Sequence, residues 1–104
     1  MEQLDDFTVA KDETLVVPPP DYKVILLNDD YTTKDFVVLV LRHVFHKNPV
    51  EAETIMESVH KNGKGLAGIY TYDIAASKAE LTMHLARRQG FPLRCIIEES
   101  KGHL

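Results

Sequence analysis

The sequence predicts an α+β domain in which a small three-stranded antiparallel sheet is covered by three helices, in the order β-α-α-β-α-β. Two observations lead to this prediction. Short runs of strand-forming residues occur at three places, and segments with helical apolar spacing lie between them. The chain has 104 residues, of which 44% are hydrophobic, so it can hold one compact core but hardly two.

The first 20 residues differ in composition from the rest of the chain. Residues 1–21 contain six acidic residues and one basic residue, and Pro18, Pro19 and Pro20 form a stiff, extended spacer. We therefore expect residues 1–20 to be a flexible, acidic extension that ends in prolines, and residues 21–104 to be the core domain. A disordered solubilising leader is the simpler interpretation of the extension, and a segment presented to a partner is the alternative.

The first strand and the first helix follow directly. Residues 22–27 are a short apolar run that ends abruptly at three polar residues, which predicts a largely buried strand. Thr32, with Asp35 three residues on, has the pattern of a helix N-cap. The expected helix has an apolar face made of Phe36, Leu39, Val40, His43 and Val44. Val37, Leu41 and Phe45 widen this apolar surface, so the helix should be packed on more than one side.

The second helix has the clearest start and stop signals. Asn48 is a capping residue, Pro49 fits the first helical position, and Glu51 completes a capping box. Gly63 is the expected end. The residues at helical spacing that should face the core are Ala52, Ile55, Met56 and Val59.

The remaining elements are a strand, a helix and a strand. Residues 66–70 predict only a short strand, because Gly65 and Gly68 weaken its strand character. Residues 73–89 are rich in alanine, lack glycine and proline, and predict a third helix that ends at Gly90. Residues 93–98 predict a last strand with Leu93, Cys95 and Ile97 on one face.

Composition limits the classes of function. Cys95 is the single cysteine, so a disulfide framework and a Cys-rich zinc site are excluded. We expect no cofactor. The residues after the acidic extension are nearly neutral and lack a basic stripe, so nucleic-acid binding is not expected. No apolar stretch approaches membrane-spanning length, and the acidic start does not resemble a signal peptide, so we expect no membrane partner and a cytoplasmic location.

The most informative polar cluster is Asn28-Asp29-Asp30, between a predicted buried strand and a predicted buried helix. Carboxylates and an amide carbonyl accept hydrogen bonds, so their natural ligand is a multiple donor such as an ammonium group. His60, at the apolar edge of the second helix, could act as a further acceptor when neutral. The alternatives are an Asx-turn for the cluster and a packed histidine in the core.

Enzymatic interpretations rest on weaker patterns. A metal-assisted hydrolase would use Asp29, Asp30 and His60, whereas His43 and His46 lack further ligands to complete a metal set. Cys95 alternates with core residues and fits packing better than nucleophilic chemistry. We therefore expect a binding protein rather than an enzyme. A structural partner module, similar in architecture to the C-terminal domain of the ribosomal stalk protein, is a further alternative.

Several separated segments together resemble the bacterial ClpS family. They are residues 22–32, Phe36-Val37, the helix end from Met56 to His60, Gly63-Lys64-Gly65, Ala75 with Lys78, and Pro92-Leu93. The resemblance covers essentially all of residues 22–99. It implies a monomeric adaptor that binds proteins with an N-terminal Phe, Tyr, Trp or Leu and delivers them to a ClpA- or ClpC-type AAA+ unfoldase with its ClpP peptidase.

The resemblance also implies a role for individual residues. The α-amino group of the substrate would be bound by Asn28, Asp29, Asp30 and His60. The substrate's side chain would enter a pocket lined by Thr32, Lys34, Val37, Met56, Val59 and Leu93. Asp73 and Lys78 match family positions that contact the unfoldase's N-terminal domain. Lys34 departs from the family, which commonly has methionine there as a gate of the pocket.

Overall fold

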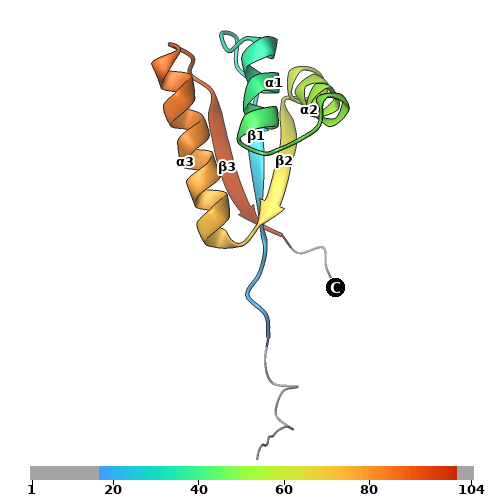
Figure 1. Ribbon diagram of the computed structural model, residues 1–104, viewed down its shortest axis with the longest axis vertical. Coiled ribbons are helices and arrows are strands. Elements are labelled where there is room, and N and C mark those ends of the chain that lie inside the picture. Colours follow the sequence, from blue (N-terminus) through green and yellow to red (C-terminus); the bar gives the residue numbers. More distant parts are fainter. Residues whose placement is uncertain (1–16, 101–104) are drawn as a thin grey trace, which may run out of the picture.

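A computed structural model describes residues 17–100 and contains three helices and one three-stranded sheet within that range. The elements are β1 (Tyr22–Leu27), α1 (Lys34–His43), α2 (Pro49–Asn62), β2 (Lys64–Tyr70), α3 (Tyr72–Arg88) and β3 (Arg94–Glu99) (Figure 1). The predicted fold class and element order are therefore confirmed. The prediction of a disordered tail falls mostly on residues 1–16, outside the described residues.

β1 is the central strand, and it pairs antiparallel with β2 on one side and with β3 on the other. Tyr22 lies opposite Tyr70 in β2 and Glu99 in β3, whereas Leu27 at the other end lies opposite Lys64 and Arg94. A bulge between Val24 and Ile25 shifts the β2 register. The first strand of the chain thus becomes the middle of the sheet, which buries it as its apolar composition requires.

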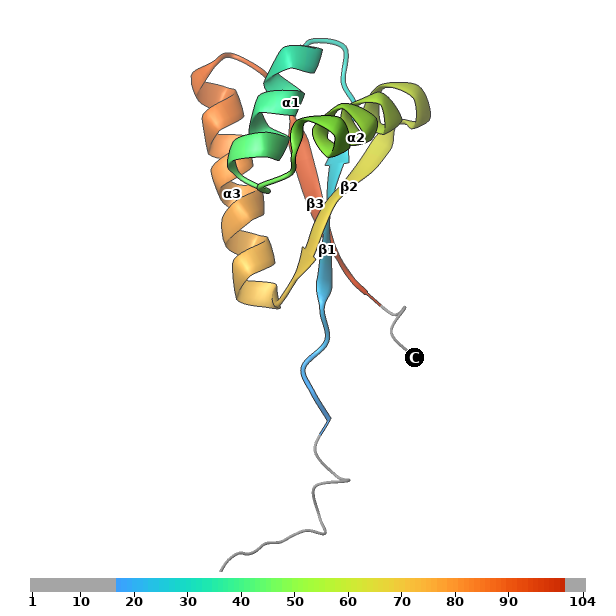
Figure 2. The same cartoon turned by 45° about the vertical axis from the view of Figure 1, so that its right-hand side comes forward.

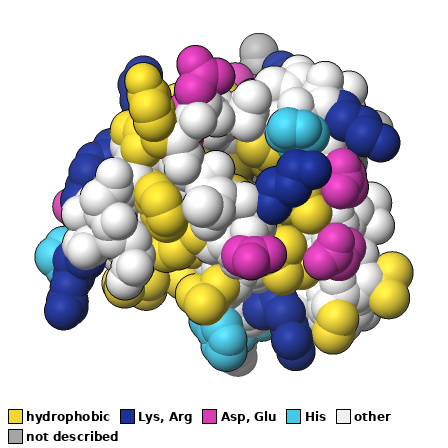
Figure 3. Space-filling model, turned by 90° about the horizontal axis from the view of Figure 1, so that it is seen from above, with side chains coloured by type: hydrophobic (Ala, Val, Ile, Leu, Met, Phe, Trp, Pro, Cys, Tyr) yellow, Lys and Arg dark blue, Asp and Glu magenta, His cyan; other side chains and the backbone are white. Residues whose placement is uncertain are grey.

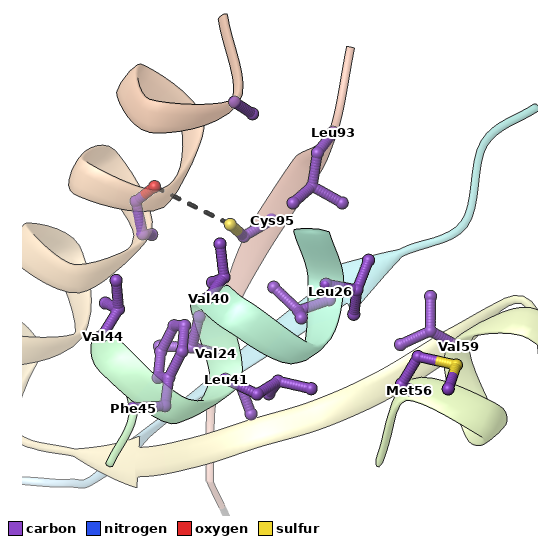
Figure 4. Close-up of a cluster of buried hydrophobic side chains, with 14 of the residues drawn as sticks. Val24, Leu26, Val40, Leu41, Val44, Phe45, Met56, Val59, Leu93 and Cys95 are labelled. Carbon is purple, nitrogen blue, oxygen red and sulfur yellow. Dashed lines mark hydrogen bonds between the residues drawn. The ribbon is translucent and has the colours of Figure 1, made fainter. Parts of the chain in front are cut away.

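The three helices pack on the same face of the sheet (Figures 1 and 2). Val24 and Leu26 of β1, Ala67 of β2 and Cys95 of β3 join a single core with buried residues from α1, α2 and α3. Figure 4 shows this cluster, with Leu26 between Leu93 and the side chains of α1. Alternation along each strand directs every second side chain away from the helices.

Helix α1 begins one residue later than predicted. Thr33, not Thr32, is the N-cap, and its side chain accepts a hydrogen bond from the Phe36 amide. The predicted apolar face also needs correction, because Leu39 is 49% exposed and His43 is exposed. The buried residues of the helix are Phe36, Val37, Val40 and Leu41. Val37, Leu41 and Phe45, which were expected to widen the apolar surface, are buried as predicted, so only Leu39 and His43 are wrong.

Helix α2 is as predicted at both ends. Asn48 and Glu51 form a reciprocal capping box with Pro49 in the first turn, and Gly63 ends the helix with a φ of 90°. This left-handed conformation favours glycine. β2 starts at Lys64 and is longer than predicted, because Gly65 allows close packing on α2: a Cβ atom there would lie 2.7 Å from Cγ2 of Val59.

The third helix and the last strand differ from prediction by one residue at their ends. Leu93, just before β3, is 1% exposed, and Cys95 is buried on the same face of the strand. Among residues 17–100, no helix is both long and apolar enough to span a bilayer.

Candidate functional site

The β1–α1 loop and the last turn of α2 lie side by side at one end of the sheet. The amide of Asn28 donates a 2.9 Å hydrogen bond to the carbonyl of Gly63, the residue that ends α2. This backbone bond extends the pairing of Leu27 with Lys64 by one step. It brings the polar cluster after β1 next to His60, which is 32 positions later in the sequence.

Asp29 holds the loop in its conformation. Its Oδ1 atom accepts from the Tyr31 amide at 2.8 Å and from the Thr32 amide at 2.7 Å, and its Oδ2 atom accepts from the Thr32 hydroxyl at 2.7 Å. The Asx-turn considered from the sequence is therefore present. Oδ2 keeps acceptor capacity, because a carboxylate oxygen can accept more than one bond.

The Asp29 carboxylate stays ionised at neutral pH. Partial burial raises its pKa, but the bonds from Thr32 and Tyr31, together with the positive charge of Arg87, outweigh burial and hold the pKa below its usual value. The loop therefore carries a fixed negative charge, and its hydrogen bonds are lost only as the pH falls through this lowered pKa.

Arg87 affects the charge and shape of the site, and it was not predicted from the sequence. It lies in the last turn of α3, and its Nη1 atom donates to the carbonyls of Leu93 at 2.8 Å and Phe91 at 3.0 Å. These bonds fix the segment that leads into β3 while the guanidinium acts on Asp29 through its charge. In the sequence, Arg87 shows only as a basic residue near the end of a predicted helix. Basic residues are common at that position, so this pattern does not indicate a role in the site.

A cavity of about 260 Å³ opens between this loop and α2. Nine of the ten residues predicted to bind a peptide N-terminus line it: Asn28, Asp29, Asp30, Thr32, Lys34, Val37, Met56, Val59 and His60. The tenth, Leu93, is not among them and lies in the core. Figure 3 shows apolar side chains at this end of the molecule, surrounded by charged side chains and a histidine.

The cavity has a polar side and an apolar side. Met56 and Val59 are 6% and 3% exposed, and they lie together at the edge of the core cluster (Figure 4). Asn28, Asp30 and His60 are exposed, and their side chains have no hydrogen-bond partner among residues 17–100. Acceptors beside a small apolar surface suit a ligand with an ammonium group next to an apolar group.

The two residues assigned to an unfoldase contact lie on α3, which begins at the opposite end of the sheet from the cavity (Figure 1). Asp73 is exposed in the first turn. Lys78 is half-buried: its Nζ atom donates a 2.6 Å bond to the carbonyl of Val44 and lies 5.3 Å and 6.0 Å from the ring centres of Tyr70 and Phe45. Lys78 therefore caps the C-terminus of α1 within this chain.

Two further predictions concern reactive groups. Burial raises the pKa of the Cys95 thiol to about 11, outweighing the opposing charge of Arg87, and the thiol contacts the carbonyl of Ala79 at 3.7 Å. Cys95 is thus a neutral packing residue. Within residues 17–100, no three or more His, Cys, Asp or Glu side chains are grouped so that they could hold a metal ion.

The fold and the cavity together define a class: a small α+β domain in which the described residues form a cavity with acceptor groups on one side and an apolar surface on the other. Similarity to known proteins then identifies the family of this chain. The family model described as "ATP-dependent Clp protease adaptor protein ClpS" matches residues 17–96. The chain belongs to this ClpS family, whose members are protease adaptors, and it is accordingly an adaptor rather than an enzyme.

Individual relatives agree with the family match. The ATP-dependent Clp protease adapter protein ClpS of Acetivibrio thermocellus is 52% identical over 97 residues, which cover 91% of this chain and 98% of that protein. The protein of the same name from Janthinobacterium sp. is 49% identical over 96 residues, covering 91% and 94%. The structure of Agrobacterium tumefaciens ClpS2 bound to L-phenylalaninamide has a TM-score of 0.77 and 37% identity, covering 80% of this chain and all of that one.

Proposed function

We propose that this adaptor binds proteins whose N-terminal residue is Phe, Tyr, Trp or Leu, through both the free α-amino group and the side chain of that residue. The observation that carries the proposal is the cavity itself, in which Asn28, Asp29, Asp30 and His60 line the same space as Val37, Met56 and Val59. The structural relative with L-phenylalaninamide bound supports it, because that ligand joins an α-amino group to an aromatic side chain.

The expected contacts suffice for useful affinity. Burying an aromatic side chain contributes about 2–3 kcal/mol, and a charge-assisted hydrogen bond about 1.5–3 kcal/mol. Several such bonds to the ammonium would give micromolar binding, which needs about −8 kcal/mol after the costs of association. The ionised Asp29 supplies a charge, and exposed Asn28, Asp30 and His60 supply further acceptors.

The test compares matched peptides that differ only at the N-terminus. Fluorescence anisotropy should show binding of a peptide that begins with Phe, and loss of binding when its amino group is acetylated, because acetylation removes the charge and leaves the acceptors unpaired. A peptide beginning with Ala is the control for the side-chain contribution. Equal affinity for the free and acetylated peptides would contradict the proposed amine site.

We further propose that the adaptor works in the cytoplasm as a monomer and delivers its substrates to a ClpA- or ClpC-type unfoldase that acts with ClpP. Asp73 and Lys78 would contact the unfoldase's N-terminal domain. Asp73 is exposed and well suited to such a contact, whereas Lys78 is already bonded to Val44, so a partner would meet mainly its stem or compete for its ammonium.

The delivery step is tested by separating it from peptide binding. Asp73→Lys should abolish pull-down by an immobilised unfoldase N-terminal domain while peptide affinity stays unchanged, because α3 begins far from the cavity. Glu80→Lys, another exposed acid on α3, is the matched control. Lys78 is unsuitable as the first variant, since its substitution also removes the bond to Val44. Retained pull-down with Asp73→Lys would count against this contact.

A further inference from the structure

The face of the sheet that points away from the helices is an apolar surface with a basic border. On β1 it presents Lys23, Ile25 and Leu27, because Val24 and Leu26 point into the core. The paired strands add Leu66 and Ile69 from β2, Ile96 from β3, and the charged residues Lys64, Arg94 and Glu98. We call these nine residues the outer sheet face. None of them belongs to the core cluster.

In the part of the chain that the structure describes, Ile25 is only 7% exposed, whereas the other eight residues of the outer sheet face are partly or fully exposed. Leu66 and Ile69 are 43% and 47% exposed, although both are large apolar side chains within a strand. Figures 1 and 2 show all three helices on the other side of the sheet. A contiguous apolar patch with a polar border is typical of a docking surface.

The charges of this face select an acidic occupant. Three cations, Lys23, Lys64 and Arg94, surround the apolar centre, and Glu98 is the single acid. Two copies stacked face to face would bring these cations together, which disfavours a symmetric dimer through this surface. An acidic segment with apolar side chains would fit both the border and the centre.

The chain itself contains such a segment. Residues 1–16 hold five acids, Glu2, Asp5, Asp6, Asp12 and Glu13, against one base, Lys11. Apolar side chains alternate with them at Leu4, Phe7, Val9, Leu15 and Val16. The segment is joined to β1 through residues 17–21. In extended form, 16 residues reach up to about 55 Å, far more than the length of the six-residue β1, so the segment can return along the sheet.

We propose that residues 4–16 dock on the outer sheet face, with their apolar side chains on Leu66, Ile69 and Ile96 and their acids near the basic border. Covalent attachment favours this occupant over an acidic protein in solution, because a short linker gives an effective concentration in the millimolar range. At this effective concentration, the docked state is populated even if the individual contacts are weak. An unfoldase that binds this segment would first have to displace it from the outer sheet face.

The experiment uses the full chain with a nitroxide spin label at Thr8→Cys, since Cys95 is buried and does not compete for the label. Methyl NMR signals of Leu66, Ile69 and Ile96 should lose most of their intensity. Ile74 and Leu81 on α3 are the matched controls, because they are 48% and 46% exposed and should keep their intensity. Equal broadening at both surfaces, or none at the outer face, would overturn the proposal.

Two further arms make the result specific. Lys64→Glu combined with Arg94→Glu should restore the outer-face signals, whereas Arg88→Glu, an exposed cation on α3, should not. Mixing spin-labelled chains with separate isotope-labelled chains tests for docking between molecules. Undiminished outer-face signals in the mixture support docking within one chain, and broadening as strong as in the doubly labelled chain would refute it.

Discussion

At the scale of single residues, Asp29 combines two tasks. It holds the β1–α1 loop through three hydrogen bonds, and it is one of the carboxylates that line the cavity. His60 lines the same cavity, but its side chain has no hydrogen-bond partner among residues 17–100. The two residues should therefore respond differently to substitution.

His60→Ala should weaken binding of a Phe-first peptide by about tenfold or more without changing the free energy of unfolding, because loss of one acceptor in a desolvated site costs at least ~1.4 kcal/mol. Asp29→Ala should weaken binding at least as much and also destabilise the fold. Anisotropy titration and urea unfolding of both variants check this expectation. Unchanged peptide affinity in both would exclude these residues from the site.

Among residues 17–100, Lys34 is the one lysine or arginine that lines the cavity. Its stem can line the wall while the ammonium reaches water, so steric exclusion of β-branched side chains should persist. Lys34→Met should raise peptide affinity modestly, and more at low salt, because a charge that repels the peptide's ammonium is removed. Lys34→Ala should increase Ile and Val binding relative to Leu. Affinities for four peptides at two salt concentrations test this, and wild-type binding of Ile and Val equal to Leu would rule out a gate.

Thr82 carries a buried hydroxyl group that lowers the stability of the fold. Its side chain is fully buried in α3, and its hydroxyl has no partner among the described residues. Thr82→Val should raise the free energy of unfolding by about 1 kcal/mol, because a methyl group of similar shape avoids the cost of burying an unpaired hydroxyl. Thr82→Ser, which keeps the hydroxyl and loses the methyl, should destabilise. Chemical denaturation distinguishes the two, and a less stable valine variant would refute this explanation.

At the scale of elements, the position of α2 decides the shape of the cavity. β2 lies against this helix at Gly65, where a Cβ atom would be 2.7 Å from Cγ2 of Val59 and 3.0 Å from the carbonyl oxygen of Ile55. The second contact is with backbone and cannot be relieved by a side-chain rotation. Any side chain at Gly65 must therefore move α2, which carries Met56, Val59 and His60.

Gly65→Ala should lower both the free energy of unfolding and peptide affinity, because the helix has to shift away from the sheet. Gly90→Ala is the matched control: its φ of 82° imposes a backbone cost of about 1–2 kcal/mol, but no atom lies within 4 Å of the new Cβ. The control should lose stability and keep its affinity. Measuring both quantities for both variants separates cavity distortion from general destabilisation, and full peptide affinity in Gly65→Ala would show that the cavity tolerates the shift.

At the scale of the whole molecule, recognition and hand-over are expected to use different parts of the chain. Among the described residues, those that line the cavity all lie from Asn28 onward in the chain, whereas the acidic segment precedes the prolines. Deleting residues 1–17 should leave peptide affinity unchanged and abolish substrate degradation by the unfoldase and peptidase. A fluorescent substrate measures degradation beside the anisotropy titration. Full degradation with the truncated adaptor would contradict a role of the segment in delivery.

The sequence by itself determined the elements and their order. The capping box at Asn48 and Glu51, the stop at Gly63 and the apolar run of β1 are signals carried by neighbouring residues, so they could be interpreted without knowledge of the fold. The same locality explains the small errors. Thr32 and Thr33 are both capable caps, and the choice fell on Thr33 because the Thr32 hydroxyl is bonded to Asp29.

The tertiary structure alone decided what the elements bring together. From the residues themselves, a shared site of Asn28-Asp29-Asp30 and His60 was one hypothesis beside an Asx-turn and a packed histidine. The family resemblance favoured the shared site, and the Asn28–Gly63 backbone bond shows how the two segments meet. The sequence likewise did not predict that Lys78 bonds to the carbonyl of Val44, or that Leu93 lies outside the cavity. Local sequence records the periodicity of each element, but contacts between distant residues depend on how strands pair and helices rotate, which the whole core determines at once.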